Sequence, residues 1–205
     1  MYNRRSTPKV RDGRVQKKNR HAPTRLNSLS VGLSRPASGF RQVTSKQDIW
    51  KFLRLIPDWK RVSSDLDMIY LCCRGDVDYD GYYGFPQHPE IVLAPWANDL
   101  KIRTSGDHFR QHEAIFRQLG AAIVQVKGGF ECRFTEESAR AYQLLHIFLH
   151  ELGHHHYRIT AGRGKSGGSE KYAEDYALRR HHNLWRDYCH AFKFDPAQER
   201  KNLVD

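Results

Sequence analysis

Apolar residues recur at helical spacing in several stretches of the chain. In these stretches the apolar positions fall three or four residues apart, which gathers their side chains on one face of a helix. The flanking residues agree, because Ser45 or Thr44 can cap the first stretch, Pro57 ends it, and Thr135 can cap the third. The pattern predicts helices over residues 45–56, 107–120, 135–157 and 169–192.

Shorter apolar runs between these helices predict β-strands. Residues 69–73 form one continuous apolar run, and EIVLAP at residues 90–95 predicts a second short strand that Pro95 ends. Residues 121–134 contain two β-rich runs around a Lys-Gly-Gly turn, which predicts a hairpin. Residues 76–89 are expected to be a loop, and a polar tail is expected after the last helix. This order of elements predicts an α+β fold with a small, mostly antiparallel or mixed sheet.

The positive charge of the chain is concentrated in its first 44 residues. The 205-residue chain has a formal net charge of +11, and residues 1–44 contain eleven Lys and Arg against a single acid. Such a segment cannot bury enough apolar surface to offset its chain entropy, so we expect a disordered basic tail before one folded domain over residues 45–205. The tail is expected to contact nucleic acid non-specifically, or else only to aid solubility or to be removed.

The composition argues against a membrane protein and against a disulfide framework. No apolar run approaches the ~18–20 residues that a membrane span requires, and the first thirty residues lack the apolar core of a signal peptide. The four cysteines form no C-x-x-C pair, so buried thiols are expected instead of a zinc ribbon or disulfides. We therefore expect a soluble, cytoplasmic protein.

Residues 144–158, LLHIFLHELGHHHYR, carry five histidines and one glutamate. Within them His150, Glu151 and His154 spell H-E-x-x-H. Helix positions four apart differ by only about 40° around the axis, so the two imidazoles project from one face and can bind one zinc ion. Glu151 flanks that face, where it can take a proton from a water molecule that the metal activates. The motif therefore predicts zinc as the cofactor, His150 and His154 as ligands, and Glu151 as the general base.

A third protein ligand is expected from the helix that follows. A catalytic zinc site needs three protein ligands and an open position, and Glu170, Glu174 and Asp175 stand near the start of the second long helix. Glu170 and Glu174 are four residues apart and share a face, whereas Asp175 is turned by about 100° from Glu174. All three acids are candidates for the third ligand.

HELGH at residues 150–154, followed by EKYAEDYA at residues 170–177, resembles the motifs of the gluzincin metallopeptidases. The likeness covers about residues 120–190 and is similar in style to the minimal ImmA/IrrE-type proteins. It implies a zincin-like domain, with a small twisted sheet, an active-site helix and a ligand helix, that hydrolyses peptide bonds with zinc. It also implies that Glu170 binds zinc and that Glu174 accepts a hydrogen bond from a ligand histidine. The family usually has Asp where Glu174 stands, so Glu174 on zinc remains an alternative.

Several residues near the motif have more than one possible role. His146 lies one turn before His150 and is expected to support the site instead of binding the metal. The remaining histidines of the two long helices are expected at the surface: His155, His156, His181 and His182. Tyr172 and Tyr176 are expected in the core, with stabilisation of an oxyanion as the second possibility. The strand from Phe130 to Phe134 is a candidate edge strand for an extended peptide.

Three functions fit these features. The first is a zinc-dependent intracellular peptidase that cleaves an unknown protein substrate. The second is a sensing or regulatory protein that uses a zincin fold with little or no peptidase activity. The third is a nucleic-acid-associated protein whose basic tail binds and whose zinc is structural. Glu151 favours the first, because a structural zinc site has no use for a base beside an open coordination position.

Overall fold

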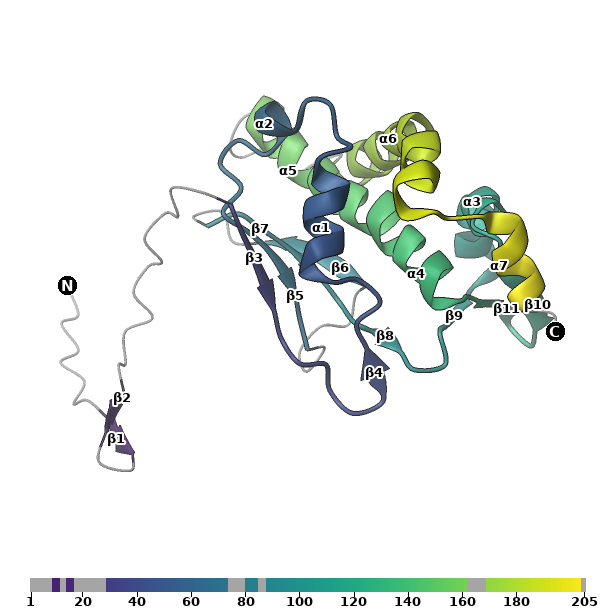
Figure 1. Cartoon of the computed structure of the whole chain (residues 1–205), viewed down its shortest axis with the longest axis horizontal. Coiled ribbons are helices and arrows are strands. Elements are labelled where there is room, and N and C mark those ends of the chain that lie inside the picture. Colours follow the sequence, from purple (N-terminus) through teal and green to yellow (C-terminus); the bar gives the residue numbers. More distant parts are fainter. Residues whose placement is uncertain are drawn as a thin grey trace.

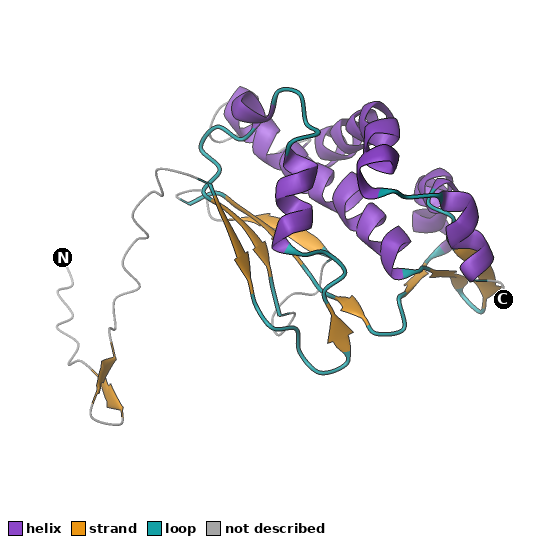
Figure 2. Ribbon diagram, viewed as in Figure 1, coloured by secondary structure: helices purple, strands orange, loops and turns teal. Residues whose placement is uncertain are grey.

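The computed structural model describes residues 9–11, 14–16, 29–73, 80–84, 88–161 and 169–203. Helices and small sheets form a mixed α+β fold (Figure 1). The helices cover one face of the larger sheet, and a smaller sheet lies beside them near the C-terminus (Figure 2). None of the helices in the described ranges combines the length with the apolar character that a bilayer-crossing segment requires.

A four-stranded mixed sheet supports the helices. Its strands, in spatial order, are β3 (Ser30–Leu33), β5 (Met68–Leu71), β7 (Glu90–Leu93) and β6 (Gly81–Gly84). The first three run parallel, whereas β6 runs antiparallel to β7 at the edge. Ile91 and Leu93 join the main core and Val92 a small cluster on the other face, because successive strand residues point to opposite faces. β6 lies in the segment predicted to be a loop, so that prediction is wrong there; its pairing with β7 makes it a strand.

A three-stranded antiparallel sheet and a two-stranded antiparallel ribbon accompany the larger sheet. One sheet has the order β10 (Ala122–Val126), β11 (Gly129–Arg133), β9 (Lys101–Thr104), and a ribbon joins β4 (Phe40–Arg41) to β8 (Trp96–Ala97). The predicted hairpin over 121–134 is confirmed by β10 and β11. The prediction that Phe130 to Phe134 forms an edge strand is wrong, because β9 pairs with the free side of β11 and places it at the centre of its sheet.

Residues 29–44 belong to the folded domain, so the predicted boundary of the tail at residue 44 is wrong. β3 pairs along its whole length with β5, β4 pairs with β8, and the side chains of Val43 and Thr44 are buried. These strands are too short to show an apolar period, and their partners lie far along the chain. Within the rest of the predicted tail, β1 (Lys9–Arg11) pairs antiparallel with β2 (Arg14–Gln16). The other residues of that tail lie outside the described residues.

Local capping explains where the helices begin. α1 (Lys46–Leu53) starts after Ser45, which forms a capping box with Asp48, and α3 (Gly106–Gln118) starts after Ser105. Together with α6 (Ser169–Phe192), they confirm three of the predicted helices. Two short helices were not predicted: α2 (Trp59–Val62) and α7 (Pro196–Asn202). α7 replaces part of the expected polar tail, because Asp195 caps it and a proline occupies its first position.

The helix predicted over 135–157 is continuous but not α-helical throughout. α4 (Glu136–Tyr142) begins after the Thr135 cap and leads into a π-helical segment, η1 (Gln143–Phe148), which is followed by α5 (Leu149–Ala161). The buried side chain of Gln143 donates a hydrogen bond of 2.7 Å to the carbonyl of Ala94, at the end of β7. π-helical turns are frequent at functional sites, and this one directly precedes H-E-x-x-H.

Candidate metal centre

His150, His154 and Glu170 lie together between α5 and the start of α6. The two Nε2 atoms are 3.2 Å apart, and each lies 3.4 Å from a carboxylate oxygen of Glu170. Ligand atoms bound at ~2.0–2.1 Å to one tetrahedral zinc ion are about 3.3 Å from one another. The three side chains therefore fit a single zinc-sized ion, and we call them the outer cluster.

Close packing of α5 against α6 brings the outer cluster together. A Cβ atom at Gly153 would lie 2.7 Å from the Cα of Ala173. Position 153 of the H-E-L-G-H segment therefore needs a glycine. Ala173 and Ala177 are buried on α6. The short distance between the two helix axes holds the first turn of α6, with Glu170, opposite the face that carries the two histidines.

Glu174 supports His150 from the side away from the outer cluster. Its Oε2 accepts a hydrogen bond of 3.1 Å from Nδ1 of His150, which leaves the lone pair of Nε2 directed at the outer cluster. Burial by itself lowers the pKa of His150, but this hydrogen bond and the charges of Glu151, Glu174 and Glu170 raise it above the ordinary value. Asp175 instead pairs with Lys171 at 2.9 Å. The geometry thus favours Glu170 over Glu174 and Asp175 as the third ligand.

Glu151 is a buried acid beside the outer cluster, with 7% of its surface exposed. Burial raises the pKa of its carboxyl to about 7; the nearby charge of Glu170 also raises it, while His150 and a hydrogen bond from the backbone N–H of Tyr83 oppose the rise. Tyr83 lies on β6, and Glu151 lies on the continuous helix of α4, η1 and α5, which we call the active helix. The edge strand and the active helix therefore meet at this carboxyl. An acid that titrates near neutral pH can both accept and return a proton there.

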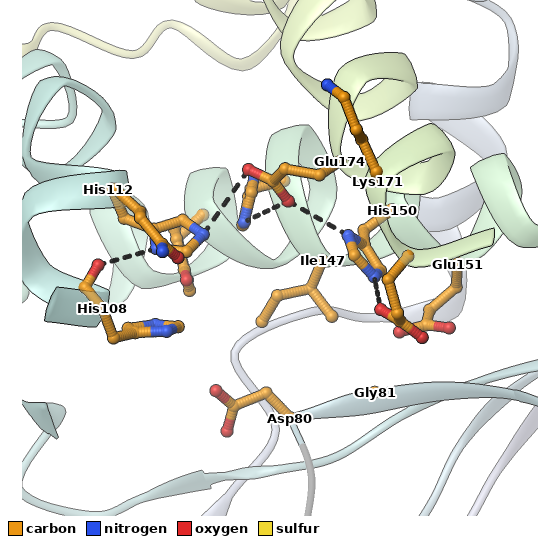
Figure 3. A pocket seen from close by; sticks show the side chains of 13 residues that line it. Asp80, Gly81, His108, His112, Ile147, His150, Glu151, Lys171 and Glu174 are labelled. Atoms are coloured by element: carbon orange, nitrogen blue, oxygen red, sulfur yellow. Dashed lines mark hydrogen bonds and ion pairs between the residues drawn. The ribbon is translucent and has the colours of Figure 1, made fainter. Parts of the chain in front are cut away.

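The outer cluster borders a pocket of about 470 Å³. Figure 3 shows its lining, which comes from α3, the active helix, α6 and the residues around the start of β6. Gly81 lets β6 approach the active helix closely, because a Cβ there would lie 2.7 Å from the side chain of Ile147. Sequence reasoning missed His108 and His112 as pocket residues. His112 stands at a helical core position of α3, and that spacing by itself indicates packing.

His155 and His181 are buried, so their predicted surface location is wrong. His155 is fully inaccessible to solvent; its Nε2 donates to the carbonyl of Ser64 at 2.8 Å, and its Nδ1 accepts from the hydroxyl of Tyr83 at 3.1 Å. His181 donates from Nε2 to Oε1 of Gln118 at 3.1 Å. Burial lowers the pKa of each imidazole to about 4. Both residues are neutral parts of the core, where helix periodicity did not place them.

The remaining histidines and the two tyrosines beside the site differ in their exposure. His182 is exposed, as predicted. His156 is half-buried instead of exposed, and its Nδ1 accepts a hydrogen bond of 2.7 Å from Tyr172. Tyr176 is buried, as predicted, while Tyr172 is half-buried and stacks on it. His146 is buried beside Glu174.

Comparison of the chain with models of protein families, with curated proteins and with solved structures finds no match. The interpretation of the site therefore depends on the residues themselves and on their geometry. The decisive features are the spacing of the outer cluster, the hydrogen bond between Glu174 and His150, and the burial of Glu151.

Proposed function

We propose that the protein is a zinc-dependent peptidase that hydrolyses peptide bonds of a protein substrate. One observation carries the proposal: a buried acid, Glu151, lies beside two histidines and a glutamate that are spaced to bind one zinc ion. Three protein ligands with a fourth position open to water or substrate are typical of catalytic zinc sites, whereas structural sites are closed. The resemblance of HELGH and EKYAEDYA to gluzincin motifs supports the same function.

Each residue of the site has a distinct task in this reaction. His150, His154 and Glu170 would hold the ion, which when bound polarises the scissile carbonyl and makes a water molecule more acidic. Glu151 takes the proton of the attacking water and then donates it to the departing amide nitrogen. Glu174 keeps His150 in the tautomer whose Nε2 is free to bind.

The edge strand β6 is suited to hold the substrate. It pairs only with β7 in the described part of the chain, and Gly81, Tyr82 and Tyr83 line the space next to His154 and Glu151. Backbone groups of an edge strand can pair with an extended peptide, which would then lie alongside the outer cluster. The backbone N–H of Tyr83 already donates a hydrogen bond to Glu151. This bond fixes the position of the proposed general base relative to β6.

A sensing role without hydrolysis is the alternative function. Burying a carboxyl costs stability when it is not fully paired, and a site that only senses a ligand gains nothing from an acid next to the ion. The burial of Glu151 therefore favours hydrolysis over sensing.

Replacement of the base tests the proposal. The full chain, loaded with zinc, is assayed for cleavage of an unfolded protein such as denatured casein, in parallel with the Glu151→Gln variant. The amide cannot accept a proton, so we expect the variant to retain its zinc and to hydrolyse about 10²–10⁴-fold more slowly. Glu137→Gln is the matched control, because Glu137 is an exposed acid of α4 in the same helical rod, and it should cleave like the wild type.

Two results would contradict the proposal. Equal hydrolysis by the wild type and Glu151→Gln would remove Glu151 from the mechanism. Absence of cleavage by the zinc-loaded wild type, on casein and on a library of extended peptides, would favour the sensing role.

A further inference from the structure

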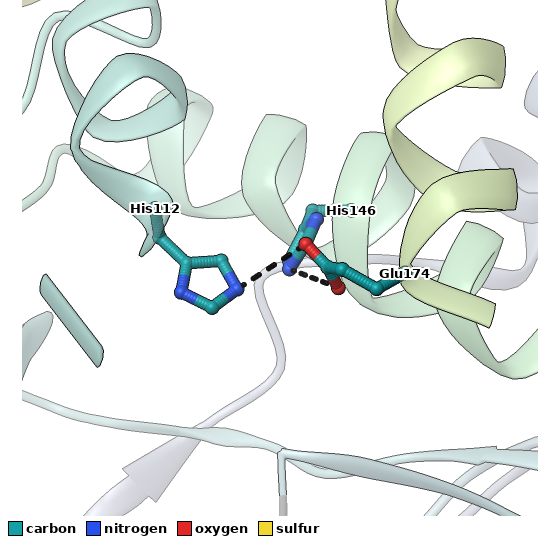
Figure 4. Close-up of side chains that lie close together, drawn as sticks. All are labelled: His112, His146 and Glu174. Atoms are coloured by element: carbon teal, nitrogen blue, oxygen red, sulfur yellow. Dashed lines mark ion pairs between the residues drawn. The ribbon is translucent and has the colours of Figure 1, made fainter. Parts of the chain in front are cut away.

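A second group of two histidines and one glutamate lies deeper in the same pocket. It consists of His112 from α3, His146 from η1 and Glu174 from α6, and we call it the inner cluster. Both rings point toward the Glu174 carboxylate (Figure 4). Nε2 of His112 lies 3.5 Å from Oε1, and Nε2 of His146 lies 3.8 Å from Oε2. Three elements that are far apart in the sequence thus place ligand atoms around one point.

One hydrogen bond fixes the ring of His112 so that its Nε2 faces Glu174. Its Nδ1 donates to the carbonyl of His108 at 2.9 Å. When the imidazole is neutral and Nδ1 carries its hydrogen, Nε2 presents a lone pair to the Glu174 carboxylate. Two acceptors that face each other at 3.5 Å repel, unless a cation lies between them.

His146 does not supply a proton that would resolve this repulsion. Its side chain is buried beside Glu174. Its separation of 3.8 Å from Oε2 is too long for a hydrogen bond. Its Nδ1 is buried and has no hydrogen-bond partner among the described residues. The inner cluster therefore gathers nitrogen and oxygen ligand atoms from two buried histidines and the half-buried Glu174.

We propose that His112, His146 and Glu174 bind a second zinc ion, distinct from the ion of the outer cluster. Two imidazoles and one carboxylate are a ligand set that zinc accepts, and their ligand atoms, all within 4.8 Å of one another, would move inward to the about 3.3 Å of tetrahedral zinc. Because His112 lies on α3, the ion would cross-link that helix to α6 and to the active helix. The second site does not depend on peptidase activity.

The two sites would be linked through one carboxylate. Oε2 of Glu174 accepts the hydrogen bond from Nδ1 of His150, and its other oxygen faces His112. A cation in the inner cluster would withdraw electron density from the carboxylate that orients His150. Occupancy of the inner site would therefore adjust the basicity of an outer ligand.

Zinc stoichiometry tests the second site. The full chain is dialysed against buffered free zinc and its bound metal is measured by elemental analysis. We expect two equivalents for the wild type, one for His112→Asn and for His146→Asn, and one for the double variant His150→Ala/His154→Ala. The control His182→Asn removes an exposed histidine of α6 and should retain two equivalents. Zinc contents of His112→Asn and His146→Asn equal to that of the wild type would overturn the proposal.

A second measurement covers the case in which the inner variants fail to fold. It uses His150→Ala/His154→Ala, which keeps all three residues of the inner cluster. Zinc that binds only the folded state raises the unfolding temperature, so zinc should stabilise this variant, and cobalt in its place should give the absorption spectrum of a His-ligated ion. If this variant holds no metal and the wild type holds one equivalent, the inner site is refuted and the outer site stands. If both hold one equivalent, the outer site is refuted and the inner site stands.

Discussion

The active helix presents histidines to two different environments. On the side that faces the start of α6, His150 and His154 have carboxylates as neighbours and remain partly exposed. On the other side His155, the residue next to His154, is fully buried, donates to a backbone carbonyl and accepts from Tyr83. Neighbours in the sequence with the same side chain thus meet opposite surroundings. Neighbouring carboxylates orient an imidazole and raise its basicity, which favours binding of a cation. A backbone carbonyl and a phenol instead complete the hydrogen bonds of a neutral ring inside the core.

The adjacent pair His154 and His155 is the strongest test of this comparison. His154→Ala should abolish zinc binding at the outer cluster, because it removes a ligand, while changing the stability of the metal-free chain by less than about 1 kcal/mol. His155→Ala should bind zinc normally and lose about 2–4 kcal/mol of stability, because it leaves a cavity and an unsatisfied carbonyl. Urea unfolding in EDTA and zinc titration measure the two effects. Equal loss of zinc in both variants would show that His154 and His155 do not differ in metal binding.

The two glutamates of α6 test the roles of the residues around the outer cluster. Glu170→Ala removes a proposed ligand and should weaken zinc binding at the outer cluster by more than the ~10–100-fold that is typical when a residue orienting a ligand is lost. Glu174→Ala should stay within that smaller range. Both are measured in the His112→Asn background, so that the inner cluster does not contribute. If Glu174→Ala strips the outer zinc while Glu170→Ala keeps it, the two roles are swapped.

The buried histidines predict that the stability of the metal-free chain depends on pH. The pKa values of His155 and His181 are lowered to about 4 in the fold, against about 6.5 in the unfolded chain. Between pH 6.5 and pH 4 the unfolded chain therefore binds protons that the folded chain does not. Stability is full above pH 6.5 and falls as the pH drops through this window, by up to about 1.4 kcal/mol per pH unit for each residue.

Urea unfolding in EDTA at pH 7, 6 and 5 measures this dependence. His181→Gln keeps a hydrogen-bonding side chain beside Gln118 and removes one titrating group, so its stability should fall less steeply over the window. The exposed neighbour provides the control, because His182→Gln should keep the slope of the wild type. A slope for His181→Gln equal to that of the wild type would show that His181 is not held neutral in the fold.

The elements that depend on local interactions could be predicted from the sequence. Helices α1, α3 and α6 and the rod from α4 to α5 depend on apolar periodicity and on caps such as Ser45 and Thr135, which involve residues a few positions apart. H-E-x-x-H is local in the same way, because helix geometry alone brings His150 and His154 to one face. The hairpin of β10 and β11 likewise forms between neighbours joined by a short turn.

The tertiary structure alone decided which distant groups meet. Strands β3, β6 and β9 are four residues long and exist because partners elsewhere in the chain complete their hydrogen bonds, so no apolar period marks them. The orientation of α6 against Gly153 turns Glu170 toward His150 and His154, and Glu174 toward Nδ1 of His150. The place of His112 beside Glu174 depends on how α3 packs. Side-chain spacing along one helix is set by its own backbone, but distances between helices are set by the packing of the whole core.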